Sequence, residues 1–146
     1  MPLIKKENIT NETIVKTLKA AGINSEINED YDLVVVHAPD GGISFGAWVK
    51  IVNQSSILNF RTSLQCKEDI PVSKLQALVG SMNDDYSLVK FTFTIDEHGR
   101  ADVNGTYDLC IDFGIIDKQL IVSLMKFTGV FIGAIREHDK EDIFFS

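Results

Sequence analysis

Apolar residues follow two different periods along this chain, and the changes of period mark its predicted secondary structure. In three segments they recur every three or four positions, as on one face of a helix, and in five others they alternate with polar residues, as in a strand with one buried face. The helical segments span residues 10–22, 71–85 and 117–135, and the strand-like segments span residues 31–38, 45–51, 58–65, 89–95 and 106–113.

The ends of the predicted helices carry residues that start or stop a helix. Thr10 is a good N-cap residue, and Gly22 is a natural stop for the first helix. Pro71 suits the first turn of the second helix, because its missing N–H would have no partner there in any case. Asp117 is the expected cap of the third helix.

Short connections join the predicted strands. Residues 39–42 and 53–56 have the composition of turns, which favours an antiparallel meander for the first three strands. A short loop containing His98 and Gly99 joins the last two as a hairpin. The order of elements is therefore α-β-β-β-α-β-β-α. It predicts an α+β fold, a two-layer sandwich of three helices against an antiparallel five-stranded sheet.

The third predicted helix is apolar around most of its circumference. Its core stripe consists of residues at helical spacing, namely Leu120, Leu124, Phe127, Phe131 and Ile135. Ile121, Met125 and Ile132 widen the apolar band beyond that stripe. Such a helix either lies deep in the domain or presents a second face to a partner chain. We expect a homodimer with Ile121, Met125 and Ile132 at the interface, although a sheet edge could serve equally.

The length of 146 residues and an apolar fraction of 45% are ordinary for one domain with its own core. We expect a single domain over residues 1–146, with a core at about 8–135 and a charged, apolar-ended tail at 136–146. The N-terminus lacks the pattern of a secretory signal, and no stretch approaches the ~18 apolar residues of a membrane span. The expected location is therefore the cytoplasm.

The net charge of −7 makes nucleic acid and anionic membranes poor partners, because both repel an acidic surface. The same charge could attract a basic protein segment or simply keep the protein soluble. The two cysteines, Cys66 and Cys110, are expected to be reduced thiols, since nothing indicates secretion.

No motif for chemistry is present. His37, His98 and His138 lie in different predicted elements, and none has a cysteine or carboxylate at metal-ligand spacing. The glycine turn at residues 40–42 precedes a strand, whereas a phosphate-binding loop precedes a helix. We therefore expect no catalytic residue, no metal and no cofactor, and so no enzyme. An active site assembled from dispersed residues is the alternative.

Trp48 falls in the polar register of its strand, between Gly46 and Lys50. The apolar residues on either side of it must face the helices, so alternation puts Trp48 and Lys50 on the opposite face. The same rule turns Asn59 and Arg61 outward on the next strand. Because aromatic residues dominate interface hot spots, we expect a partner to contact Trp48, Lys50, Asn59 and Arg61. The alternative is a Trp48 covered by its own chain.

The tail ends in the apolar run Ile143-Phe144-Phe145, after a highly charged stretch. Three exposed apolar residues at that position would be unfavourable. They either fold back on the domain, which we favour, or dock on a neighbouring chain.

Several segments together resemble the YbjN family, whose members are often labelled sensory transduction regulators. The residues that carry the resemblance lie between about 8 and 135, and they are Ala47–Ile51, Leu58–Phe60, Leu75–Asn83, Leu88–Phe93, Gly114 and the helix from Leu120 to Phe131. These motifs are structural and include no catalytic residue.

The resemblance implies a fold similar to that of type III secretion chaperones, which are usually dimeric and wrap an extended client segment. We therefore expect a non-enzymatic, chaperone-like domain that binds a protein or peptide through exposed strand edges and apolar patches. The alternative is a regulatory or structural homodimer that binds no client.

Overall fold

The computed structural model describes residues 3–37, 46–52 and 56–144. Its longer elements are the helices α1 (Asn11–Ala20), α2 (Val72–Asp85) and α3 (Asp117–His138) and the strands β2 (Ser25–Asn28), β3 (Leu33–Val36), β4 (Ala47–Val52), β5 (Ile57–Gln65), β6 (Lys90–Ile95) and β7 (Ala101–Cys110). Two short strands, β1 (Leu3–Ile4) and β8 (Ile115–Ile116), and a 3-10 turn at Lys6–Asn8 complete the set. The turn expected at residues 39–42, most of that at 53–56, Phe45 and Phe145 lie outside the described residues.

The six longer strands form one antiparallel sheet in the order β2-β3-β4-β5-β7-β6, and β1 pairs with β8. The α+β fold, the meander and the final hairpin are confirmed. The main sheet has six strands rather than five, because β2 pairs with β3 at the edge. The buried residue of β2 is Ser25, so β2 lacks the apolar alternation that marks the other strands.

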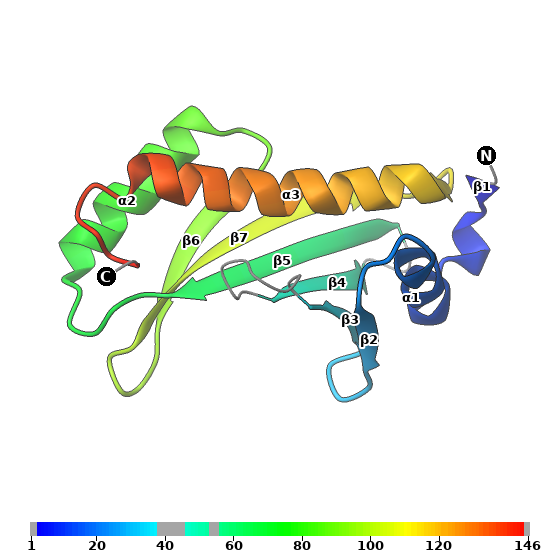
Figure 1. Cartoon of the computed structure of the whole chain (residues 1–146), viewed down its shortest axis with the longest axis horizontal. Helices are drawn as coiled ribbons and strands as arrows, with labels where there is room; N and C mark the ends of the chain where they lie inside the picture. Colours follow the sequence, from blue (N-terminus) through cyan, green and yellow to red (C-terminus); the bar gives the residue numbers. More distant parts are fainter. Residues whose placement is uncertain (1–2, 38–45, 53–55, 145–146) are drawn as a thin grey trace.

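Helices α2 and α3 cover one face of the sheet, and α3 runs along its length (Figure 1). Helix α1 packs against β2 and β3. Under α3, the ring of Phe60 on β5 lies 6.1 Å from that of Phe127, and Phe91 on β6 stacks on Phe131 at 6.0 Å. Strand residues that face the helices thus meet the α3 stripe in one aromatic core.

Thr10 caps α1 as expected. Its hydroxyl accepts a hydrogen bond from the backbone N–H of Thr13 at 3.2 Å, and the Thr13 hydroxyl accepts one from the N–H of Thr10 at 2.8 Å. This reciprocal pair satisfies two N–H groups that the first turn of a helix leaves free.

The predicted stripe of α3 is buried along its whole length, but the start of the helix differs from the expectation. Asp117 is the first helical residue, and the N-cap is Ile116, which makes no side-chain capping bond. Within the described residues, α3 alone is long and apolar enough, by length and composition, to cross a membrane. Its stripe lies in the domain core, and 33% of the apolar window is buried.

The last strand lies further towards the N-terminus than its alternation predicts. Strand β7 begins at Ala101 rather than at residue 106, and Phe113 lies beyond it with 94% of its surface exposed. The small residues Ala101 and Gly105 occupy buried positions of β7, and Gly105 leaves room for the ring of Phe131 on α3. The early part of the strand therefore carries a weak apolar signal.

The C-terminal tail folds back on its own chain. Helix α3 continues to His138, so the expected boundary at residue 135 falls inside it. The chain then turns back alongside α2 (Figure 1), and the Lys67 N–H donates to the carbonyl oxygen of Ile143 at 2.8 Å. Ile143 is only 2% exposed and Phe144 packs against the same core, whereas Phe145 lies outside the described residues.

Candidate functional site

The face of the sheet that points away from the helices carries the four residues expected to bind a partner. Trp48 on β4 pairs directly with Arg61 on β5, and Lys50 pairs with Asn59. The neighbours of Trp48 along the strand, Ala47 and Val49, are buried on the helix side. The structure therefore places Trp48, half-buried, with Lys50, Asn59 and Arg61 on one surface, as the alternation predicts.

Hydrogen bonds hold the polar residues of this face in position. The Asn59 amide donates to Asp108 at 2.6 Å and to the hydroxyl of Thr106 at 2.9 Å, both on β7. Its oxygen accepts a bond from Nε of Arg61 at 3.0 Å, so the guanidinium is oriented by a neutral group. Lys50 donates to the backbone oxygen of Tyr31 at 3.2 Å.

Two shallow grooves flank the Trp48–Arg61 pair. One encloses about 440 Å³ on the β3–β4 side, and its polar and charged lining includes Lys50 and Asn59. The other encloses about 380 Å³ on the β6–β7 side. Its lining adds residues that sequence reasoning did not assign to the site, namely Thr62, Lys90, Thr92, Thr94, Asn104, Gly105 and Thr106. The alternation in the sequence indicates which residues of each strand face outward. It does not indicate that β7 pairs with β5, which brings β6 near Arg61.

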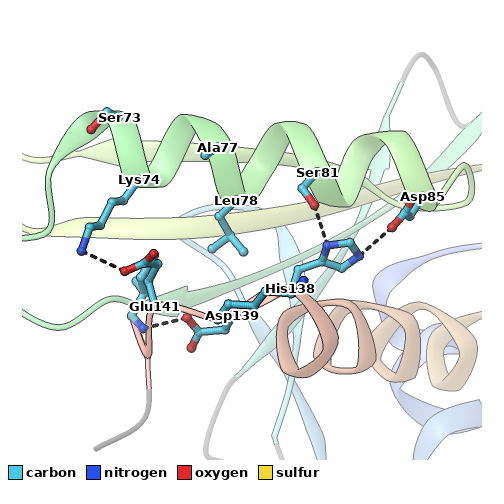
Figure 2. A pocket seen from close by; sticks show the side chains of 11 residues that line it. Ser73, Lys74, Ala77, Leu78, Ser81, Asp85, His138, Asp139 and Glu141 are labelled. Carbon is cyan, nitrogen blue, oxygen red and sulfur yellow. Dashed lines mark hydrogen bonds and ion pairs between the residues drawn. The ribbon is translucent and has the colours of Figure 1, made fainter.

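A separate polar pocket of about 540 Å³ lies between α2 and the chain that follows α3 (Figure 2). At its end the hydroxyl of Ser81 lies 2.6 Å from Nδ1 of His138, and Asp85 lies 3.0 Å from Nε2. The Asp85 contact is close enough for an ion pair, but Nε2 makes no hydrogen bond of good geometry. Only 10% of the His138 side chain is exposed, so this cluster ties the end of α3 to α2.

Serine, histidine and aspartate are also the residues of a hydrolase triad, so the chemistry of this pocket needs testing. A triad requires free N–H groups beside the serine to stabilise an oxyanion. Ser81 lies inside α2, where the backbone N–H groups serve the helix, and the N–H groups of Ile143 and Phe144 already donate to Asp139. This geometry favours a structural cluster. Sequence reasoning missed it because only the Ser81–Asp85 spacing on one helix is visible without the fold.

The tail beyond His138 is fastened by charged residues as well as by Ile143. Glu141 pairs with Lys74 of α2 at 3.1 Å, and Asp142 pairs with Lys67 at 3.0 Å. Both pairs are exposed to solvent, so each contributes little stability by itself. The buried side chain of Ile143 is the main anchor of the tail.

Within the described residues, three ionisable groups have shifted pKa values. Burial raises the pKa of the Cys66 thiol to about 11, with Asp102 and Asp139 adding to the effect. A hydrogen bond to Glu137 raises the pKa of Tyr86, and hydrogen bonds from Ser56 and Lys6 lower that of Asp112. None of these groups lines the Trp48 grooves.

No protein-family model and no curated protein sequence matches the chain. Among solved structures it is similar to the crystal structure of YbjN from E. coli, a proposed transcription regulator, with a TM-score of 0.72. The match covers 92% of this chain and 94% of that chain at 13% sequence identity. The chain has a YbjN-like fold. At this identity the likeness concerns the arrangement of the elements alone, and it confirms at that level the resemblance found in the sequence.

The outer face of α3 in this YbjN-like fold carries the residues expected at a dimer interface. Met125 is 63% exposed, Val122 is also exposed, and Ile121 and Ile132 are half-buried at the rim of the buried stripe. The helix therefore presents apolar side chains to its surroundings beyond those that the core uses.

No group of three or more histidine, cysteine or acidic side chains is placed to hold a metal ion in the part of the chain that the structure describes. Cys66 is buried and Cys110 is exposed, and both are free thiols.

Proposed function

We propose that this protein is a non-enzymatic binding domain that takes up an extended segment of a partner protein, in the manner of a chaperone, on the open face of its sheet. The observation that carries the proposal is the Trp48–Arg61 pair, which stands between two grooves on the face away from the helices. A half-buried indole beside an oriented guanidinium has the composition of an interface hot spot.

The surroundings of the pair also suit a peptide. Threonine hydroxyls and asparagine amides line the grooves, and such groups can bond to the N–H and C=O groups of an extended backbone. The sheet edge at β2 offers a further row of backbone groups. At the β6 edge, the backbone groups of Phe91 already bond to the side chain of Asn83. The likeness to YbjN supports a regulatory or binding domain in general, and the client is our own inference.

The test is quantitative co-purification with matched variants. Trp48→Ala should weaken retention of a partner by about 2 kcal/mol or more, the size of a hot-spot loss, and should leave the fold intact. Phe113→Ala is the control, since Phe113 is an exposed aromatic residue that lines neither groove. Partners retained equally by both variants, or lost equally from both, would contradict the proposal.

A second candidate is a regulatory or structural homodimer without a client, which the exposed Met125 on α3 favours. Light scattering at micromolar concentration should then give about twice the chain mass of 16.3 kDa, and Met125→Lys should return it to the monomer value. Lys126→Glu, a charge change at the next exposed position, is the control. A monomer mass for the unaltered protein would exclude this candidate.

A further inference from the structure

The two grooves beside Trp48 differ in charge from the rest of the molecule, although Glu26, Asp102 and Asp108 lie elsewhere on the same face of the sheet. The chain has a net charge of −7, yet the two grooves are lined by Lys50, Arg61 and Lys90 and, among the residues that the structure describes, by no aspartate or glutamate. The ion-paired lysines of the described chain, Lys6, Lys67 and Lys74, all lie elsewhere.

These three cations have no anionic partner within the described residues. Arg61 bonds to the neutral amide of Asn59, and Lys50 bonds to a backbone carbonyl. The Lys90 ammonium makes no hydrogen bond or ion pair to any described residue, although Asp102 and Asp108 lie on the neighbouring strand. Positive charges that no nearby carboxylate neutralises can pair with an incoming anion.

The strand register fixes the spacing of the groups. Trp48, Arg61, Thr106 and Lys90 occupy one line across the adjacent strands β4, β5, β7 and β6. Neighbouring strands lie about 4.8 Å apart, which puts Trp48 about 5 Å and Lys90 about 10 Å from Arg61 along this line. An extended peptide advances about 3.3 Å per residue, and its side chains on one side recur every second residue, so residues two or four apart (about 7 or 13 Å) come nearest to this spacing.

We propose, on the basis of the binding function proposed above, that the partner segment is acidic. It carries one carboxylate at Arg61 and a second, two or four residues further on, at Lys90. An apolar side chain two residues before the first carboxylate rests on Trp48. The proposed partner segment is thus negatively charged, whereas the net charge of the chain alone would favour a basic segment.

A nucleic acid fits the same cations less well. Its phosphates form a continuous line of charge, and a strand laid across this face would meet Glu26, Asp102 and Asp108 on both sides of the three cations. A peptide, in contrast, can place its carboxylates next to Arg61 and Lys90 and neutral residues next to the aspartates and the glutamate of the sheet.

The test uses a displayed library of random peptides, long enough to cross the sheet, selected on the full chain and counter-selected on Trp48→Ala. Enriched peptides should share an apolar residue followed by two acids at the stated spacing.

For one such peptide, replacing either glutamate by glutamine should weaken binding about tenfold, as should Lys90→Gln, since each removes one charge-assisted hydrogen bond. Lys126→Gln, an exposed cation on α3, is the control and should leave binding unchanged. Because Trp48 is the only tryptophan in the chain, its fluorescence reports whether the peptide occupies this site.

The outcomes separate the two proposals. Enrichment of basic or neutral peptides that depend on Trp48 would overturn the acidic segment and leave the binding function standing. Tighter binding of a single-stranded oligonucleotide than of the selected peptides would overturn it in favour of a nucleic acid. The absence of any enrichment that depends on Trp48 would overturn both.

Discussion

Gly105 of β7 lies directly under the ring of Phe131 on α3. A Cβ atom at position 105 would stand 2.5 Å from Cδ2 of that ring. The ring cannot easily move, because it is fully buried and stacked on Phe91. The sheet and the α3 layer thus approach each other as closely as a glycine allows.

Gly105→Ala should therefore lower the free energy of unfolding by about 1–3 kcal/mol, the usual effect of overpacking a core. Gly129→Ala is the matched control, because Gly129 is an exposed helical position with free space around it. That change should raise the stability by up to about 1 kcal/mol through helix propensity. Urea denaturation measures both, and equal effects from the two variants would contradict the close approach at Gly105.

Ile143→Ala should lower the stability by about 2–4 kcal/mol, because it empties a fully buried aliphatic position. Hydrogen exchange of the Lys67 amide should accelerate at the same time, since that N–H donates to the carbonyl of Ile143. Glu141→Ala is the control. It removes only the exposed pair with Lys74 and should change the stability by less than about 1 kcal/mol. An unchanged Lys67 amide in Ile143→Ala would show that the tail is not anchored as described.

The Ser81–His138 contact should behave as a structural bond. A double-mutant cycle between Ser81→Ala and His138→Ala should give a coupling of about 0.5–3 kcal/mol in the free energy of unfolding. Hydrolysis of an activated ester should proceed at the same rate in Ser81→Ala as in the unaltered protein, because the N–H groups near Ser81 are already paired. A rate lost in this variant, with the fold intact, would instead identify Ser81 as a nucleophile.

Stability should fall at alkaline pH because of Cys66. Burial raises the pKa of its thiol from 9.0 to about 11 in the folded chain. As the pH rises above 9, the thiol ionises in the unfolded chain while it stays protonated in the folded one. This ionisation stabilises the unfolded state relative to the folded state, so the free energy of unfolding falls. Urea denaturation under reducing conditions between pH 8 and about 11 should reveal this loss. Cys66→Ala should flatten the slope, and Cys110→Ala, at an exposed thiol, should retain it.

Much of the fold could be predicted because the period of apolar residues reports which side of an element is buried. The stripe from Leu120 to Ile135, the outward register of Trp48 and Arg61, and the Thr10 cap all follow from local patterns, and the structure has each of them. A side-chain period is a property of one element, so it needs no knowledge of the neighbouring elements.

Only the tertiary structure decided which strands and helices are neighbours. Edge strand β2 is held by backbone hydrogen bonds that almost any residue can make, so Ser25–Asn28 carries no side-chain signal. Lys90 joins the line of Trp48 and Arg61 only because β7 pairs with β5. His138 meets Ser81 across 57 positions of sequence because α2 and α3 pack side by side. The sequence by itself thus determined which face of each element is buried and which is exposed. The pairing of distant strands and helices determined which exposed faces come together as sites, and that pairing depends on packing the whole core.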